Sequence, residues 1–268
     1  MRQVVHVVLA LLLVVSPVGA QSPDTTSRGD KTFLTRRDLV TGGLALTTAA
    51  LLSIWDTDIA QSSQTSRFQD SSVIRFANRA SKVNETTLTV GGILIYGVGR
   101  LTKSRTTSDI ALHATESVIL ASVASQLIRG PLGRTRPHVT NDSNQYHFEP
   151  FKGFGSFENR AFPSIHTSSS MAVATVLMME SHRRKPGATP FVAPLLMTAG
   201  LLPGLARIQL NQHWASDIFA GAFMGVFAGY KVVKYSHDHP TNRIDRALLN
   251  FSVTQAENGR VMVGFGTR

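Results

Sequence analysis

The chain has 268 residues, no cysteine and a formal net charge of +10. Without cysteine a disulfide-stapled fold is excluded, and the length suffices for one domain with a full hydrophobic core. The positive charge favours an anionic partner, but the arginines and lysines are scattered between apolar segments, which argues against the basic face of a nucleic-acid-binding protein. We therefore expect a phosphate group in a pocket, or anionic lipid, as the partner, and no nucleic acid.

The first twenty residues have the pattern of a secretory signal peptide. Arg2 precedes an apolar run from Val4 to Val15, and small residues up to Ala20 offer a cleavage site. The alternative is an uncleaved membrane anchor, although a span needs roughly 20 residues and this run is shorter. Residues 21–37 are polar at their start and are expected to form a disordered mature N-terminus, so we expect an exported protein.

Apolar periodicity, interrupted by prolines and charged clusters, predicts an all-α bundle of six to seven helices over residues 38–240. The expected helices are Asp38–Trp55, Ile59–Ala80, Glu85–Thr102, Ser108–Ile128, Thr167–His182, Pro190–Ala206 and Trp214–Tyr235. Residues 241–268 form a tail in which Asn258-Gly259 lies between alternating apolar runs, a pattern typical of a small β-hairpin.

The longest irregular stretch runs from His138 to Phe162. A loop of this length inside a compact domain is usually functional or mobile, and it lies between two clusters of chemically active residues. We interpret it as a lid over a site, with a simple surface excursion as the alternative. Its phenylalanines are Phe148, Phe151, Phe154 and Phe157.

The hydropathy pattern leaves two hypotheses open. The apolar runs cover about 12 to 17 residues, less than a comfortable span, and the mean hydropathy is only +0.03. These features favour an exported domain that is soluble or rests on an anionic membrane. Against this, Gly221, Gly225 and Gly229 recur at four-residue spacing, a close-packing face common in membrane helices. We expect the first hypothesis, a soluble or peripheral domain.

Three short clusters carry the chemistry. In the first, from Arg129 to Pro137, glycine and proline fix a turn that holds Arg129, Arg134 and Arg136. Guanidinium groups bind phosphate oxygens in a planar, bidentate way and stay charged at any working pH. The alternative interpretation is a basic surface loop or a positive flank at a membrane face.

The second cluster is Pro163-Ser164-Ile165-His166, which has the composition of a helix start. The free N–H groups of a helix N-terminus attract an anion, and His166 beside them could donate a proton to a leaving oxygen. The alternative is a capping sequence that contains an incidental histidine.

The third cluster contains Arg207, His213 and Asp217. His213 and Asp217 are four residues apart, so on a helix they share one face. A carboxylate on one ring nitrogen fixes the tautomer and leaves the other nitrogen free to attack. The alternative is a helix-capping histidine with a local polar partner.

Together the clusters suit phosphoryl transfer, because its transition state spreads negative charge over oxygens that fixed positive groups can stabilise. At these residues the chain resembles the type 2 phosphatidate phosphatase family, related to vanadium haloperoxidases and bacterial acid phosphatases. The family pattern is Lys-x6-Arg-Pro, Pro-Ser-Gly-His and Ser-Arg-x5-His-x3-Asp, and the similarity covers roughly residues 88–235. Here Arg129 stands in the lysine slot, Ile165 replaces the glycine and Ala206 replaces the serine. Isoleucine resists positive φ, so the anion site is altered if the family's glycine needs that conformation.

The resemblance implies a helical bundle and a two-step hydrolysis. His213 would attack phosphorus and form a phosphohistidine, Asp217 would orient His213, and His166 would protonate the leaving alcohol and then help to activate water. The residues implied to hold the phosphoryl oxygens are Arg129, Arg136, Arg207 and Ser164.

The resemblance therefore implies a phosphatase that acts on phosphomonoesters or lipid phosphates and diphosphates. The signal-peptide pattern adds the expectation that it is exported and works in the periplasm, or at the membrane with its site on the periplasmic face. No metal and no cofactor are expected, and vanadate is expected at most as an inhibitor. The alternatives are a vanadate-dependent haloperoxidase and a non-catalytic relative that binds phosphate or anionic lipid. Substrate identity and oligomeric state are left open by the sequence.

Other polar residues receive simpler interpretations. Asp56 and Asp58 are interpreted as polar groups at a helix end, not as paired catalytic acids. His113 and Glu116 lie one turn apart and are expected to form a buried polar contact. The run His237-Asp238-His239 is interpreted as a solvated tail beyond a helix, with a metal site as the alternative.

Overall fold

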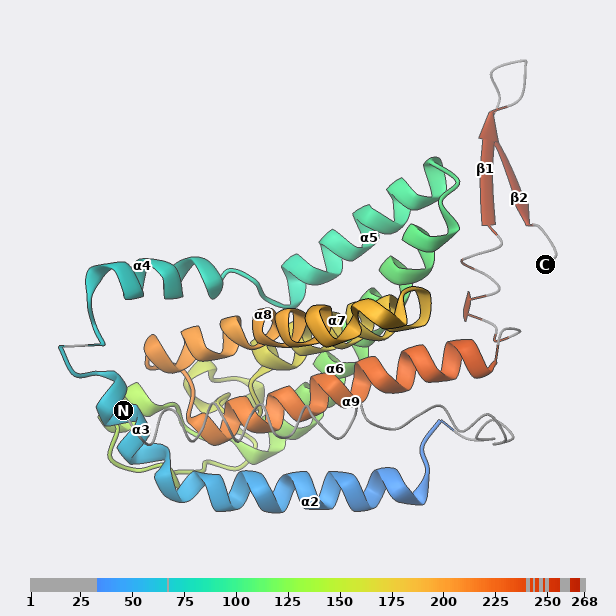
Figure 1. Ribbon diagram of the computed structural model, residues 1–268. Coiled ribbons are helices and arrows are strands. Elements are labelled where there is room, and N and C mark those ends of the chain that lie inside the picture. The colour runs from blue at the N-terminus through green and yellow to red at the C-terminus, as the bar shows by residue number, and fades with distance from the viewer. Residues whose placement is uncertain are drawn as a thin grey trace.

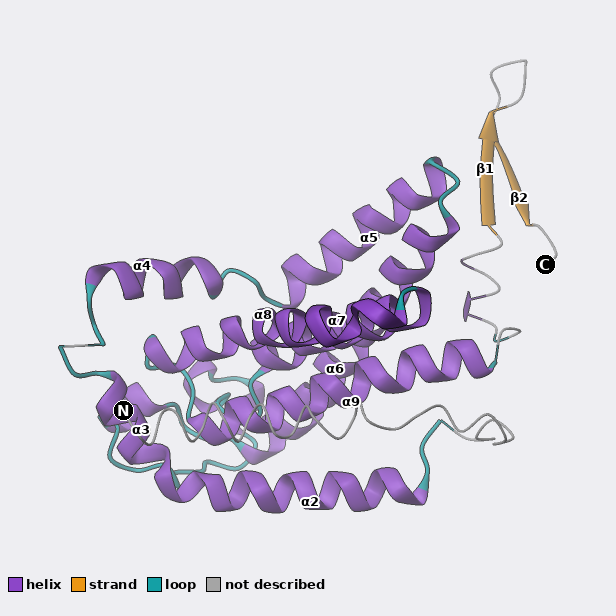
Figure 2. Ribbon diagram, in the orientation of Figure 1, coloured by secondary structure: helices purple, strands orange, loops and turns teal. Residues whose placement is uncertain are grey.

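A computed structural model of the chain describes residues 33–66 and 68–239, and beyond them residues 242, 244, 245, 248, 251–255 and 261–265. The predicted signal peptide, and residues 21–32 of the predicted disordered segment, lie outside this described part. The described part is a helical bundle, which confirms the all-α fold class (Figures 1 and 2). Its α-helices are α2 (Arg36–Leu52), α3 (Asp56–Ser63), α4 (Ser71–Ala80), α5 (Glu85–Leu101), α6 (Arg105–Leu132), α7 (Ile165–Arg184), α8 (Thr189–Gln209) and α9 (Ala215–Asp238).

Short 3-10 helices and a pair of strands complete the described elements. The 3-10 helices are η1 (Ser53–Trp55), η2 (Pro137–Thr140), η3 (Lys152–Phe154), η4 (Phe157–Asn159) and η5 (Pro186–Ala188). Strands β1 (Phe251–Gln255) and β2 (Val261–Phe265) are antiparallel, with Val253 opposite Val263. The connecting residues 256–260 lie outside the described part, and the tail hairpin stays a prediction.

Most helices begin and end within a few residues of the expected positions, but the single helix expected over residues 59–80 is two helices. The carbonyl oxygen of Ser63, at the end of α3, accepts a hydrogen bond from the side-chain amide of Gln69 at 2.9 Å. Asp70 then caps α4 by accepting the N–H of Ser72 at 2.7 Å. These side chains satisfy main-chain groups that a continuous helix would pair internally, and so they stabilise the break.

Helix α7 lies at the centre of the bundle and packs against α6, α8 and α9. The glycine face of α9 meets α7, as its four-residue spacing predicts. A Cβ atom at Gly225 would lie 2.3 Å from the carbonyl oxygen of Ser168, and one at Gly221 would lie 2.5 Å from that of Ser164. The absence of side chains therefore lets the two helix backbones come into contact.

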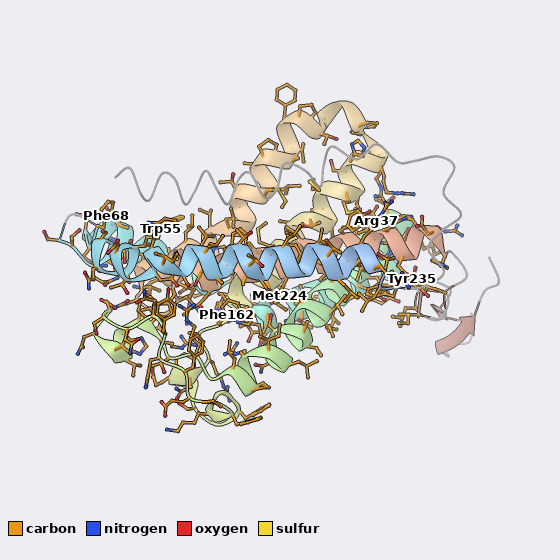
Figure 3. All side chains as sticks on the ribbon, turned by 90° about the horizontal axis from the view of Figure 1, so that it is seen from below. Arg37, Trp55, Phe68, Phe162, Met224 and Tyr235 are labelled. Atoms are coloured by element: carbon orange, nitrogen blue, oxygen red, sulfur yellow. The ribbon has the colours of Figure 1, made fainter. Side chains whose placement is uncertain are left out.

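The outer helices carry apolar side chains that no other described element covers. Figure 3 shows α2 lying across the bundle, between Arg37 at one end and Trp55 at the other, and α2 packs on α9. The exposed apolar residues of α2, α5 and α8 are Leu39, Val40, Leu44, Leu46, Leu51, Val90, Ile93, Leu94, Ile95, Val98, Leu101, Phe191 and Leu195. Apolar surface of this extent marks contact with lipid, so the protein is membrane-associated.

Four described helical segments are long and apolar enough to cross a membrane: Arg36–Ser63, Arg105–Leu132, Pro186–Gln209 and Ala215–Asp238. The short apolar runs of the sequence are parts of these helices, whose lengths are 24 to 28 residues. Buried polar residues inside the bundle lower the mean hydropathy without shortening the spans. The structure therefore favours the multispan hypothesis over the soluble or peripheral domain that we expected.

The contact between α7 and α9 yields a test. Gly225→Ala puts a methyl group against the α7 backbone, so we expect a loss of about 1–3 kcal/mol of stability from overpacking. Gly43→Ala is the matched control, because no atom lies within 4 Å of the added methyl and helix propensity improves by up to about 1 kcal/mol. Thermal unfolding in detergent measures both variants. Equal melting temperatures would contradict the close contact.

Candidate functional site

The three chemical clusters of the sequence meet at one end of the bundle. The C-terminal ends of α6 and α8 and the N-terminal ends of α7 and α9 all lie there (Figure 1). Helix N-termini carry unpaired N–H groups and partial positive charge, which suits an anion.

Gly133 shapes the first cluster. It ends α6 with a φ of +63°, and a Cβ atom would lie 1.8 Å from the carbonyl oxygen of Glu149, so only glycine fits. The chain then pairs with the following loop: the Glu149 N–H donates to the Gly133 carbonyl and the Thr135 N–H donates to the His147 carbonyl, both at 2.9 Å. The loop expected to be a lid is thus held against the arginine cluster by main-chain hydrogen bonds and forms a wall of the site; its opening stays a prediction.

Ser164 and His166 lie where the sequence predicts, at the start of α7. The Ser164 N–H donates to the main-chain carbonyl of Asp217 at 3.1 Å, which ties the starts of α7 and α9 together. The Ser164 hydroxyl accepts a hydrogen bond from Thr167 at 3.0 Å, so its own proton is available to a ligand. Ile165 is the first residue of α7 and is not among the described residues with positive φ. Isoleucine is therefore accommodated here without backbone strain.

His213 and Asp217 are brought together at the start of α9. Nδ1 of His213 lies 3.4 Å from Oδ2 of Asp217, and both side chains are buried. The same carboxylate oxygen accepts the N–H of Trp214 at 2.8 Å, which caps the helix. The carboxylate lies on the Nδ1 side of the ring, so Nε2 is the nitrogen that remains for chemistry.

The imidazole of His213 is held neutral. Burial lowers its pKa well below the usual 6.5, and the positive charges of Arg136, Arg207 and Arg129 lower it further. A neutral ring keeps a lone pair at neutral pH, which a nucleophile needs. The same three arginines and His213 also act electrostatically on His166, so both histidines face one cluster of charge.

Arg129, Arg136 and Arg207 form a cluster of cations with few protein partners. Burial and the charges of Arg207 and Arg129 lower the pKa of Arg136 to about 9. The Nε atoms of Arg129 and Arg207 are buried and have no hydrogen-bond partner among the described residues. Crowded buried cations are unfavourable unless an anion binds between them, so the site is built for a multivalent anion.

Gln212 is a site residue that the sequence analysis missed. Its Oε1 accepts hydrogen bonds from Nη1 of Arg136 at 2.6 Å and from Nη2 of Arg207 at 3.4 Å. One amide oxygen therefore holds two repelling guanidinium groups together. Ala206, buried in α8, provides no hydroxyl at the position of the family's serine.

The sequence analysis also missed the structural roles of Arg134 and Asp56 at the site. Arg134 donates to Oδ1 of Asp217 at 2.6 Å and to Oδ2 of Asp56 at 2.8 Å, and all three side chains are buried. Oδ1 of Asp56 accepts the N–H of Ser216 at 2.8 Å. Asp56 is thus more than a polar group at a helix end: it anchors the arginine that holds the acid beside His213. Asp58, by contrast, is exposed.

For two further histidines, the structure differs from the sequence-based prediction. His113 contacts Glu180 of α7 at 3.0 Å rather than Glu116. His237 lies inside α9, not in a solvated tail, and also contacts Glu180, at 2.7 Å. Both lie near the other end of the bundle from the candidate site.

Asp56 and Asp58 form a natural pair for mutation. Asp56→Asn removes one of the two carboxylates that contact the buried Arg134 and weakens the hydrogen bonds of residue 56 with Ser216, so we expect a loss of about 1–3 kcal/mol of stability. Asp58→Asn changes an exposed group and should stay within about 0.5 kcal/mol of the parent. Thermal unfolding of both variants in the same detergent compares them, and an Asp56→Asn protein as stable as Asp58→Asn would contradict the assigned role.

Comparison with known proteins agrees with this geometry. Residues 110–240 match the PAP2 superfamily. The chain is 28% identical over 132 residues to a lipid A 1-phosphatase of Rhizobium etli, covering 48% of this chain and 52% of that protein. It is 30% identical over 141 residues to a lipid A 1-phosphatase of Porphyromonas gingivalis, covering 52% of this chain and 29% of that protein. The chain thus spans about half, or less, of the length of these curated relatives.

Among solved structures, the chain is similar to a transmembrane PAP2-type phosphatidylglycerolphosphate phosphatase from Bacillus subtilis, at 19% identity and a TM-score of 0.38. That match covers 73% of this chain and 98% of the other. The residues 110–240 that match the PAP2 superfamily include every candidate residue from Arg129 to Asp217, so the chain resembles that family at the residues of the site.

Proposed function

We propose that this protein is a membrane-embedded phosphatase that hydrolyses a lipid phosphate through a phosphohistidine at His213. The observation that carries the proposal is the convergence of a buried imidazole, a second histidine and three arginines at one end of the bundle, two of which have a buried Nε atom without a partner among the described residues. That set supplies a nucleophile, a proton donor and a binding site for phosphoryl oxygens.

In the first step, Nε2 of His213 attacks phosphorus and the bond from phosphorus to the ester oxygen breaks. Burial and the charges of the arginines lower the pKa of His166 to about 3 in the free site. The negative charge of a bound phosphate offsets the arginines, so that His166 carries the proton that it gives to the departing alkoxide, and an alcohol leaves. Asp217 stabilises the imidazolium that forms as His213 takes the phosphoryl group. The three phosphoryl oxygens bind the arginine cluster and the free hydroxyl proton of Ser164.

In the second step, His166 takes a proton from water, and the resulting hydroxide attacks phosphorus. The phosphorus–nitrogen bond breaks, phosphate leaves and His213 returns to the neutral form. The arginine cluster supplies the positive charge that a metal ion would supply in other phosphatases, so the reaction needs no cofactor. Vanadate, which resembles the transition state, is expected to inhibit.

An apolar groove beside the site favours a lipid substrate. It has a volume of about 350 Å³ and lies between α4, α5, α7 and α8. Ser170 and Pro203, which line it, lie one helical turn from His166 and Arg207, so an acyl chain in the groove would bring its phosphate to the arginines. The curated relatives act on lipid A, as their names state, and we propose a phosphorylated lipid of that kind here.

The charge of the short connections favours a site on the exported side. The turn between α5 and α6 and the turn between α7 and α8 lie at the end opposite the site (Figure 1). They and the start of α2 carry Arg36, Arg37, Arg100, Lys103, Arg105, Arg183, Arg184 and Lys185. At the site end, the short connection of residues 210–214 has no lysine or arginine, and the longer connection of residues 133–164 carries four such residues, of which Arg134 and Arg136 are buried in the site. Basic connections stay in the cytoplasm, so the site faces the periplasm in this proposal.

The nucleophile is tested by His213→Ala. Without its nucleophile, the enzyme should lose at least about 10³-fold in kcat on both p-nitrophenyl phosphate and a phospholipid monoester in mixed micelles. His182→Ala, an exposed histidine at the far end of α7, is the matched control and should keep full activity. Hydrolysis that survives in the His213→Ala protein would contradict the assignment, and wild-type protein that binds phosphate without turnover would identify a non-catalytic relative.

The groove is tested separately by Ala199→Phe. Ala199 lines the groove, and a phenyl ring there should exclude an acyl chain while leaving the arginine cluster unchanged. We expect KM for a long-chain lipid phosphate to rise at least about 10-fold, the scale of one lost apolar contact, with p-nitrophenyl phosphate hydrolysed as before. Ala50→Phe on the exposed face of α2 is the control. Equal effects on both substrates would contradict a lipid groove.

A further inference from the structure

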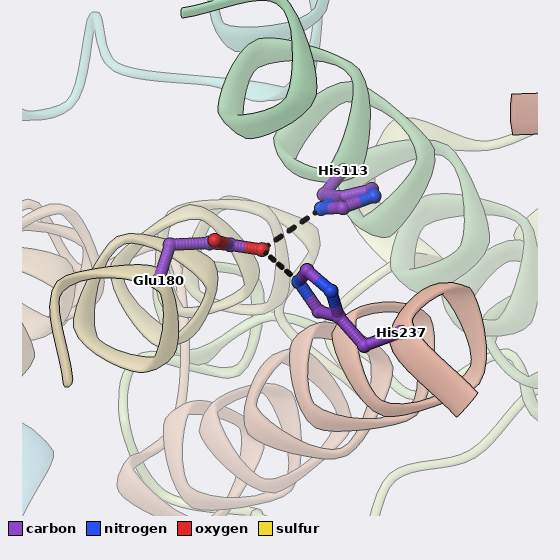
Figure 4. Close-up of side chains that lie close together, drawn as sticks. All are labelled: His113, Glu180 and His237. Atoms are coloured by element: carbon purple, nitrogen blue, oxygen red, sulfur yellow. Dashed lines mark hydrogen bonds and ion pairs between the residues drawn. The ribbon is translucent and has the colours of Figure 1, made fainter. Parts of the chain in front are cut away.

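A second cluster of ligating side chains lies away from the candidate site. His113 from α6, Glu180 from α7 and His237 from α9 converge near the opposite end of the bundle (Figure 4). Glu180 is fourteen residues beyond His166 on the same helix, which places them about 21 Å apart along its axis. The cluster therefore takes no part in the chemistry at His213.

Two imidazole nitrogens of the cluster face the same carboxylate oxygen. Oε1 of Glu180 lies 3.0 Å from Nδ1 of His113 and 2.7 Å from Nε2 of His237, and all three atoms lie within 4.8 Å of one another. The two imidazole rings are nearly perpendicular, at 75°, with centroids 5.4 Å apart. Two imidazole nitrogens and one carboxylate oxygen are a donor set that Zn²⁺ takes, at about 2 Å from each atom.

Charged side chains lie beside two of the three ligands, Glu180 and His113. Arg184 binds Oε2 of Glu180 and leaves Oε1 for the cluster. Oδ2 of Asp245 lies 3.9 Å from Nε2 of His113, on the side of the ring away from Glu180. A carboxylate behind a metal-bound histidine is the usual arrangement that sets the ring's tautomer.

The local charge also favours a cation. Glu116, on α6, lies within electrostatic range of both His113 and Asp245. Three carboxylates, those of Glu116, Glu180 and Asp245, thus gather around the two imidazoles, and Arg184 is their one arginine partner among the described contacts.

We propose that His113, Glu180 and His237 bind one divalent transition-metal ion of the zinc class, through Nδ1, Oε1 and Nε2 respectively. The side chains of His113 and Glu180 are 3% and 1% exposed, whereas that of His237 is 25% exposed and gives the ion a path from solvent. A water molecule completes the four-coordinate set. The ion joins three helices whose other ends carry Arg129, His166 and Asp217, so it acts as a structural clamp on the bundle.

Metal binding to the purified full-length protein tests the proposal. The protein is prepared in detergent with a removable tag free of histidine, stripped with a chelator and titrated with Zn²⁺ or Co²⁺ alone. We expect one equivalent of zinc after gel filtration, a higher melting temperature with zinc, and the visible absorption of four-coordinate cobalt.

Variants assign the ion to these residues. His237→Gln removes the most exposed ligand with little risk to folding, and Glu180→Gln removes the central carboxylate; each should weaken zinc binding at least about 10-fold and abolish the cobalt spectrum. His182→Gln, an exposed histidine two residues beyond Glu180 on α7, should bind like the parent. Wild-type protein that binds zinc no more tightly than His237→Gln would overturn the proposal and leave a hydrogen-bonded cluster only.

The outcome of the zinc-binding experiment does not depend on the proposed catalytic function. Phosphatase activity of the zinc-free protein should equal that of the loaded protein at temperatures below unfolding, because no ligand of the ion reaches the arginine cluster. Loss of activity in His213→Ala and loss of zinc in His237→Gln can therefore be scored separately.

Discussion

The contact of Arg134 with two buried carboxylates is the interaction on which the site depends. One guanidinium joins Asp56, at the start of α3, to Asp217, at the start of α9. An unpaired charge in this interior would be costly, so each member holds the other two in place. The carboxylate of Asp217 in turn lies 3.4 Å from Nδ1 of His213 and caps helix α9. A contact between distant parts of the chain thus determines where the reactive nitrogen points.

A second constraint is that the neighbouring arginine cluster has, in the described part of the chain, no contacting carboxylate to balance its charge. Arg129, Arg136 and Arg207 have no carboxylate partner within hydrogen-bond distance among the described residues, and one glutamine oxygen links two of them. Arg134 is neutralised and structural, whereas these three remain available for a ligand. The difference between paired and unpaired arginines explains how one basic cluster of sequence can serve both stability and anion binding.

Much of this could be predicted from the sequence, because helix periodicity and motif spacing are local properties. Seven expected site residues, from Arg129 to Asp217, face one end of the bundle, and the glycine spacing of α9 predicted its contact with α7. Asp56 and Gln212 could not be found in this way, since their roles come from partners 78 and 76 residues away in the chain. The preference for a soluble domain failed because buried serines, threonines and charges inside the bundle lowered the hydropathy of helices whose outer faces are apolar.

The central claim, that His213 accepts the phosphoryl group, is tested most directly by trapping the intermediate. In a His166→Ala protein, p-nitrophenyl phosphate supplies a leaving group that needs no acid, so the first step proceeds while the second is slowed. Rapid quenching into base and mass spectrometry should then find one phosphoryl group, labile to acid, on His213. A phosphoryl group on any other residue, or steady turnover with no covalent intermediate under these conditions, would contradict the account.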